Sequence, residues 1–156
     1  MDGREIIMKR VILGAGWRNR YQDKFMLRRE DPDMLKLLGD VIEDIPETDR
    51  NVKYLHDTRA KWWEYLQDTF VKPDCCRYAA FISLMLDAFG IDDYQVYEGY
   101  SSPPNMRTVD HEDMLKSANP IVNHVWLICQ GKLFETFNDH VDISGHNAVA
   151  KIYPLT

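Results

Sequence analysis

The stretch DCCRYAAFISLMLDAFGID, residues 74–92, constrains the fold more than any other part of this chain. Its apolar residues recur at helical spacing and form a wide stripe, which is typical of a helix near the centre of a domain. Asp74 stands where an N-cap is expected, and Gly90 stands where a glycine commonly ends a helix. The sequence therefore predicts a central helix that begins with two adjacent cysteines, Cys75 and Cys76.

Helical patterns precede this stretch and strand patterns follow it. One helix is expected from Asp31 or Asp33 to about residue 44, and a longer one over residues 48–70, with Trp62 and Trp63 in the core. Strands are expected at residues 94–100, on both sides of a tight turn within 123–137, and at 150–156. Helices followed by antiparallel strands predict an α+β fold in which N-terminal helices pack on an antiparallel sheet.

Length and composition limit what this domain binds. The 156 residues, 45% of them hydrophobic, fit one domain: a helical part at 1–73 and a core with helix and sheet at 74–156. A net charge of −6 argues against nucleic-acid binding, which depends on basic faces. No apolar run reaches membrane-spanning length and the N-terminus lacks a secretory pattern, so we expect no membrane contact and a cytoplasmic location.

Weaker signals suggest neither a cofactor nor a metal. Gly14-Ala15-Gly16 lacks the third glycine of a dinucleotide-binding turn, so a plain turn is the preferred interpretation. The three cysteines form no C-x-x-C pair, and His140 with Asp139 and Asp142 is better explained as a charged turn than as a metal site. The polar, proline-bearing segment 101–120 is long enough to be a lid or binding loop.

The paired cysteines suggest nucleophilic chemistry. A cysteine nucleophile needs a base that takes its proton and a third group that orients the base. A helix N-terminus helps, because its dipole and free amides stabilise a thiolate. The simpler alternative is that Cys75 and Cys76 are two buried core residues.

The spacing around Cys75 favours the nucleophile. Ala79 lies four residues after Cys75, Gly90 lies fifteen after it, and a predicted strand then ends in Gly99-Tyr100. Counting from Cys76 misses the glycine by one residue, so Cys76 is expected to be a neighbour pointing about 100° away around the helix axis. Farther along, His124-Val125-Trp126 opens another predicted strand.

Together these residues resemble the transglutaminase-like superfamily, over about residues 74–138. The resemblance implies a papain-related fold, Cys75 as nucleophile and His124 as its base. In that family an aspartate on the next strand completes the triad, and a His-Ala-Trp sequence stands where this chain has valine for alanine.

Strand pairing predicts the third group independently. If Gln130-Gly131 is a two-residue turn, Cys129 faces Lys132 and Trp126 faces Glu135. Glu135 then shares a sheet face with His124, because residues i and i+2 of a strand point to the same side. A bulged turn would shift the register, and Asn138 or Asp139 would take that place.

These residues predict a cysteine-dependent amide or acyl hydrolase or acyl transferase: a peptidase, amidase or protein deamidase acting on a peptide or protein side-chain amide. The Cys75 backbone N–H would be one oxyanion donor. Candidates for the second donor are Trp62, Trp63, Gln67 and Asn123. Two alternatives stay open: a catalytically silent binding module with the same fold, and a carrier of acyl groups resembling arylamine acetyltransferases.

Overall fold

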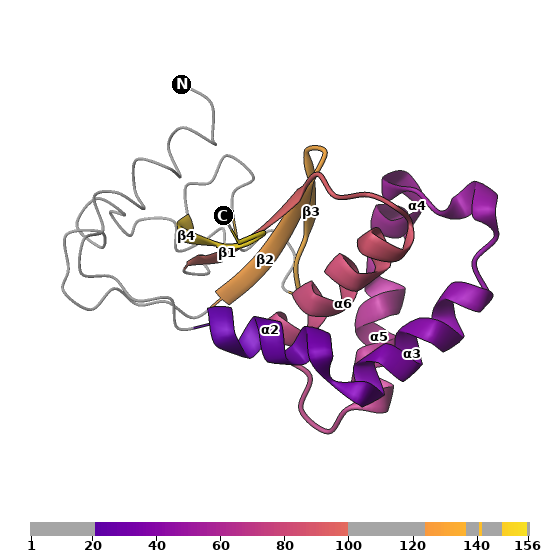
Figure 1. Cartoon of the computed structure of the whole chain (residues 1–156), viewed down its shortest axis with the longest axis horizontal. Helices are drawn as coiled ribbons and strands as arrows, with labels where there is room; N and C mark the ends of the chain where they lie inside the picture. Colours follow the sequence, from indigo (N-terminus) through magenta and orange to yellow (C-terminus); the bar gives the residue numbers. More distant parts are fainter. Residues whose placement is uncertain (1–20, 100–123, 137–140, 142–147, 156) are drawn as a thin grey trace.

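The computed structural model describes residues 21–99, 124–136, 141 and 148–155 (Figure 1). The helical part of the chain comes first, and the strands follow the last helix. The helices are α2 (Gln22–Glu30), α3 (Pro32–Glu43), the 3₁₀ helix η1 (Glu47–Asp49), α4 (Val52–Asp57), α5 (Arg59–Thr69) and α6 (Cys75–Ala88). The strands are β1 (Tyr94–Gly99), β2 (His124–Cys129), β3 (Lys132–Phe134) and β4 (Ala148–Tyr153).

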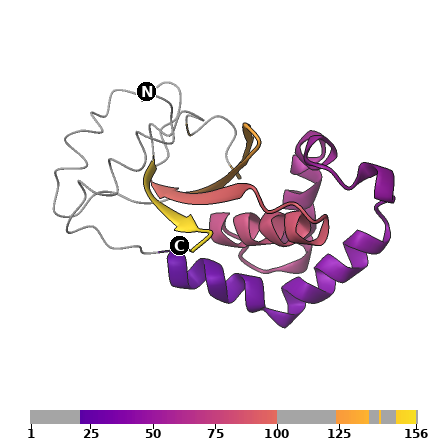
Figure 2. The same ribbon diagram turned by 45° about the horizontal axis from the view of Figure 1, so that its top comes forward.

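The strands form one antiparallel sheet in the order β3-β2-β1-β4. The described helices lie on one side of this sheet, with α6 nearest to it and α2 and α3 beyond α6 (Figures 1 and 2). A smaller apolar cluster occupies the opposite face and includes Tyr97, Trp126, Val141 and Ala148. The α+β class expected from the sequence is therefore confirmed.

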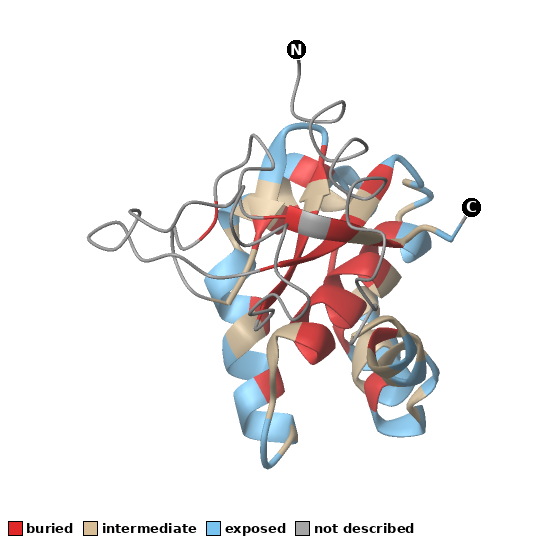
Figure 3. Ribbon diagram, turned by 90° about the vertical axis from the view of Figure 1, so that its left-hand side faces the viewer, coloured by how far each residue is buried: buried red, intermediate tan, exposed pale blue. Residues whose placement is uncertain are grey.

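Helix α6 is the buried centre of the molecule, as its apolar stripe predicts (Figure 3). It starts where the Asp74 carboxylate accepts a hydrogen bond of 2.8 Å from the Arg77 amide, which fixes Cys75 as the first helical residue. It ends before Gly90, whose φ of 78° is a conformation that glycine adopts without a steric penalty. Both sequence signals for the ends of this helix are confirmed.

The hairpin between β2 and β3 has the predicted two-residue turn. Gln130 and Gly131 have φ angles of 50° and 74°, and two successive positive values are the mark of a type I′ turn. Cys129 pairs with Lys132, and Leu127 pairs with Phe134. The strand register on which the placement of Glu135 depends is therefore confirmed.

The single long helix predicted over residues 48–70 is wrong, because α4 and α5 are separate helices joined at Thr58. The Thr58 hydroxyl donates to the Tyr54 carbonyl at 2.7 Å, the kind of local side-chain bond that competes with a continuous helix. Both tryptophans lie in α5, on different sides of the helix: Trp62 is buried in the core, as expected, whereas Trp63 is only half-buried.

Helix α2 was not predicted from the sequence, because its single buried residue, Phe25, gives it little apolar periodicity. Polar contacts hold it against α6 instead. Lys24 forms an ion pair with Asp74 at 2.6 Å, and Arg29 forms one with Asp87 at 2.6 Å. The first pair places the start of α2 beside the start of α6, and the second places the end of α2 beside the end of α6.

Several expectations fall outside the described residues: the turn at residues 14–16, the loop at 101–120, Tyr100, and the charged turn at Asp139, His140 and Asp142. Within the described part of the chain, no helix has the length and apolar character needed to cross a membrane.

Candidate active site

The three predicted site residues come from three different elements and meet. Cys75 is the first residue of α6, His124 is the first residue of β2, and Glu135 follows β3 directly. The Nε2 atom of His124 lies 3.0 Å from Oε2 of Glu135, and these side chains are 0% and 4% exposed. The expected contact between the Glu135 carboxylate and one ring nitrogen of His124 is confirmed.

The hairpin explains this contact. The last pair of the β2–β3 ladder is Leu127 with Phe134, so Glu135 is the next residue along and lies on the sheet face of Trp126. The His124 ring lies on the same face, with its centroid 5.7 Å from that of Trp126. The alternative residues of a shifted register, Asn138 and Asp139, lie outside the described residues.

The His124 imidazole connects Glu135 to Cys75. Its Nε2 atom is held by Glu135, and the ring lies near enough to Cys75 for each of these two side chains to shift the pKa of the other. Burial lowers the pKa of His124, but hydrogen bonding with Cys75 and Glu135 and the negative charges of these partners outweigh burial and raise it. The arrangement favours an imidazolium between two anions.

The Cys75 thiol is unusually acidic. A hydrogen bond from the Cys76 thiol is the largest influence on its pKa and lowers it, burial opposes this, and the hydrogen bond and charge of His124 lower it further. Hydrogen bonding from the Val125 backbone N–H also lowers the pKa of Cys75. The resulting pKa of Cys75 is about 5, so the thiolate predominates at neutral pH.

The other two cysteines have the opposite character. Cys76 is fully buried, and its hydrogen bond to the Cys75 sulfur raises its pKa. Burial raises the pKa of Cys129 to about 11. Sequence reasoning placed Cys76 beside Cys75 but missed its role as a donor, and the Val125 amide carries no side-chain signal that a sequence could reveal.

The start of α6 also presents backbone donors beside the sulfur. Asp74 accepts from the amides of Arg77 and Tyr78, through its carboxylate and its carbonyl respectively. The amides of Cys75 and Cys76 precede these and belong to the group that an α-helix leaves without an intrahelical acceptor. This geometry suits an oxyanion donor at Cys75.

The predicted candidates for a second oxyanion donor lie in different places. Trp62 packs in the core against Phe81, Gln67 is exposed on α5, and Asn123 lies outside the described residues. Trp63 points into a pocket on the Glu135 side of the site. Nothing in the described contacts brings Trp62, Trp63 or Gln67 to Cys75.

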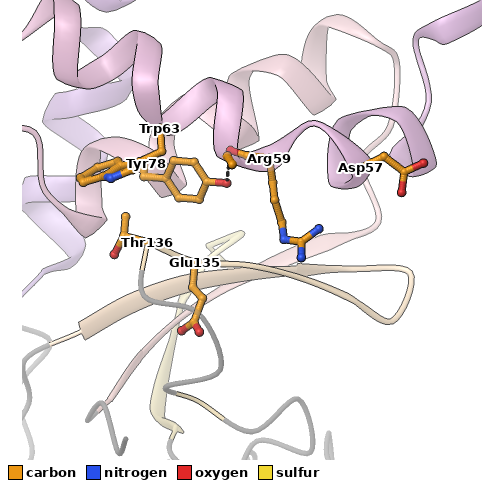
Figure 4. A pocket seen from close by; sticks show the side chains of 7 residues that line it. Asp57, Arg59, Trp63, Tyr78, Glu135 and Thr136 are labelled. Atoms are coloured by element: carbon orange, nitrogen blue, oxygen red, sulfur yellow. Dashed lines mark hydrogen bonds between the residues drawn. The ribbon is translucent and has the colours of Figure 1, made fainter.

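That pocket has a volume of about 320 Å³ and lies between α5 and α6 on one side and the residues after β3 on the other. It is lined by Asp57, Arg59, Ala60, Trp63, Tyr78, Glu135 and Thr136. The Glu135 carboxylate points away from Trp63 and Tyr78, so this residue borders the pocket while its oxygens reach His124 (Figure 4).

Among the described residues, no group of three histidine, cysteine or acidic side chains is placed to hold a metal ion. Comparisons with protein-family models, curated proteins and solved structures found no match to this chain. The interpretation of the site therefore depends on its own geometry and chemistry.

Proposed function

We propose that this protein is a cysteine-dependent amide or acyl hydrolase or acyl transferase, with Cys75 as nucleophile, His124 as base and Glu135 as orienting acid. One observation carries the proposal: the buried Glu135 carboxylate holds Nε2 of His124 at 3.0 Å, and His124 lies near enough to Cys75, the first residue of a helix, to lower the pKa of its thiol. This combination of nucleophile, base and orienting group is what covalent acyl chemistry requires.

The proposed core is of the transglutaminase-like, papain-related type, and the proposed substrate is a peptide or a protein side-chain amide. We also propose that the protein works in the cytoplasm, because all three cysteines are free thiols and a reducing compartment keeps thiols free.

In the first half of the reaction, the Cys75 thiolate attacks the acyl carbon, and the oxyanion forms at the Cys75 backbone N–H. The C–N bond then breaks, and the His124 imidazolium gives its proton to the departing amine. Glu135 holds Nε2 of the imidazole throughout, so that Nδ1 faces the sulfur and the leaving group. The product of this step is a thioester at Cys75.

In the second half, a water molecule or a second amine attacks the thioester. Neutral His124 takes the proton of this nucleophile, the C–S bond breaks, and the thiolate–imidazolium pair is restored. Water yields hydrolysis or deamidation, and an amine yields transfer.

The thioester itself provides the test. The full chain is incubated with p-nitrophenyl acetate, and intact-mass and peptide-mass measurements locate the acetyl group. We expect rapid acetylation of Cys75 with release of p-nitrophenol, and faster release when glycine ethyl ester is added as an acceptor. Cys75→Ala abolishes the rapid phase.

The competing proposal of a silent binding module predicts a different result. In that case, Cys75 is acetylated no faster than a small-molecule thiol of matched pKa. That outcome, or an acetyl group found on Cys76, would reject the proposed function.

A further inference from the structure

The pocket beside Glu135 has an aromatic wall. The rings of Trp63 and Tyr78 meet edge to face, with centroids 5.9 Å apart and planes at 89°. The Tyr78 hydroxyl donates to the Arg59 carbonyl at 3.1 Å, so the polar end of this buried ring already has an acceptor. Tyr78 is buried whereas Trp63 is only half-buried, so Trp63 presents the accessible surface of this wall, which suits a flat apolar group.

The charged groups around this wall differ in what they already bind. Asp57 is paired with Lys53 at 2.6 Å, and Glu135 is paired with His124 at 3.0 Å. Within the described part of the chain, the Arg59 guanidinium bonds groups of His56, donating to its carbonyl at 2.8 Å, and no carboxylate pairs with it. Its guanidinium extends from α5 toward the strand that closes the pocket (Figure 4).

His56, which lies beside Arg59, adds no charge at neutral pH. Burial lowers the pKa of His56, and the nearby charges of Arg59 and Lys132 lower it further. Since both lining carboxylates are already paired, with Lys53 and with His124, Arg59 is the lining side chain whose charge is left to meet a ligand. A guanidinium fork beside aromatic faces is the arrangement that recognises a carboxylate on a flat apolar body.

We propose that this pocket binds a small aromatic or flat apolar carboxylate, with the carboxylate on Arg59 and the apolar body on Trp63, which packs against Tyr78. The volume of about 320 Å³ suits a ligand of that size. The pocket borders Glu135, but neither Cys75 nor His124 lines it, so the bound group is separate from the acyl carbon. The binding involves no covalent step and does not depend on the proposed reaction.

The test compares two probes of like shape and opposite charge, 3-phenylpropionate and 3-phenylpropylamine. Each is titrated into the full-length Cys75→Ala protein by calorimetry and by tryptophan fluorescence, so that acyl chemistry contributes nothing. We expect the carboxylate to bind and the amine to bind at least about tenfold more weakly, since hydrogen bonds to charged groups carry about that discrimination.

Two matched variants complete the test. Arg59→Ala should weaken 3-phenylpropionate binding about tenfold or more, and it leaves the Arg59 carbonyl that Tyr78 uses. Lys61→Ala removes an exposed cation from the same helix, one that lies over Trp62 and Tyr65 and not in the pocket, so binding should be unchanged. Absence of carboxylate binding, equal binding of the two probes, or equal effects of the two variants would overturn the proposal.

Discussion

Glu135 acts through its negative charge as well as through its hydrogen bond. Replacing it by glutamine removes the carboxylate that raises the pKa of His124, and with it part of the support for the Cys75 thiolate. We expect Glu135→Gln to slow acetylation of Cys75 by up to about 10⁴-fold, the loss seen when a triad acid is replaced by its amide. The measurement is the rate of p-nitrophenol release, with circular dichroism to show that the fold is intact.

Glu64→Gln is the matched control, because Glu64 is an exposed carboxylate on α5. It should react like the unmodified protein. If both variants keep full activity, Glu135 has no part in the reaction and the triad assignment fails at its third member.

Cys76 supplies the hydrogen bond with the largest effect on the Cys75 sulfur. Cys76→Ala removes this donor, so the pKa of Cys75 should rise and its alkylation by iodoacetamide at mildly acidic pH should slow. Cys76→Ser keeps a hydroxyl donor at the same place and should restore most of the rate. Equal alkylation rates in all three proteins would show that Cys76 only fills the core.

At the scale of elements, the β2–β3 turn positions Glu135 and depends on a left-handed backbone. Gly131 has a φ of 74°, and a Cβ added there meets no atom within 4 Å, so Gly131→Ala introduces backbone strain without a clash. We expect it to lower the free energy of unfolding by about 1–2 kcal/mol. Urea denaturation measures this change.

Gly39→Ala is the internal comparison. A Cβ added at Gly39 also meets open space, but this residue lies inside α3, where alanine is favoured. That substitution should raise the free energy of unfolding by about 0.5–1 kcal/mol. If Gly131→Ala and Gly39→Ala both raised or both lowered the free energy of unfolding, the left-handed turn at Gly131 would be contradicted.

The sequence predicted those elements whose signals are local. The cap at Asp74, the glycine after α6 and the Gln130-Gly131 turn each specify a backbone conformation within a few residues. The break at Thr58 was missed, because a threonine inside an apolar pattern does not by itself end a helix. The Val125 amide was missed for a different reason, since every residue but proline carries one.

At the scale of the whole molecule, α2 is part of the core although its sequence is mostly polar. Phe25 is fully buried, whereas Leu27 on the same helix is 64% exposed. Phe25→Ala should lower the free energy of unfolding by about 3–5 kcal/mol, the usual cost of removing a buried aromatic ring. Leu27→Ala should change it by about 0.5 kcal/mol or less.

Similar small effects of the two substitutions would mean that α2 does not dock on α6. The docking itself could not be predicted from the sequence, because it depends on long-range ion pairs, Lys24 with Asp74 and Arg29 with Asp87. The pairing of β4 with β1 is equally non-local. The sequence pattern of each segment predicts its own secondary structure but not which distant segment it contacts.

The central claim is that Cys75 is a thiolate held by His124, and its titration tests this most directly. Carbamidomethylation of the full chain is followed by peptide mass spectrometry as a function of pH, with Cys129 as an internal reference. Because the pKa of Cys75 is lowered to about 5, its thiolate persists above that pH and is lost as the pH falls through it. The account predicts that the alkylation rate of Cys75 rises with a midpoint near pH 5 and stays high at neutral pH, while Cys129, with a pKa of about 11, reacts little there. A Cys75 midpoint near about 8.5, the value of an unperturbed thiol, would contradict it.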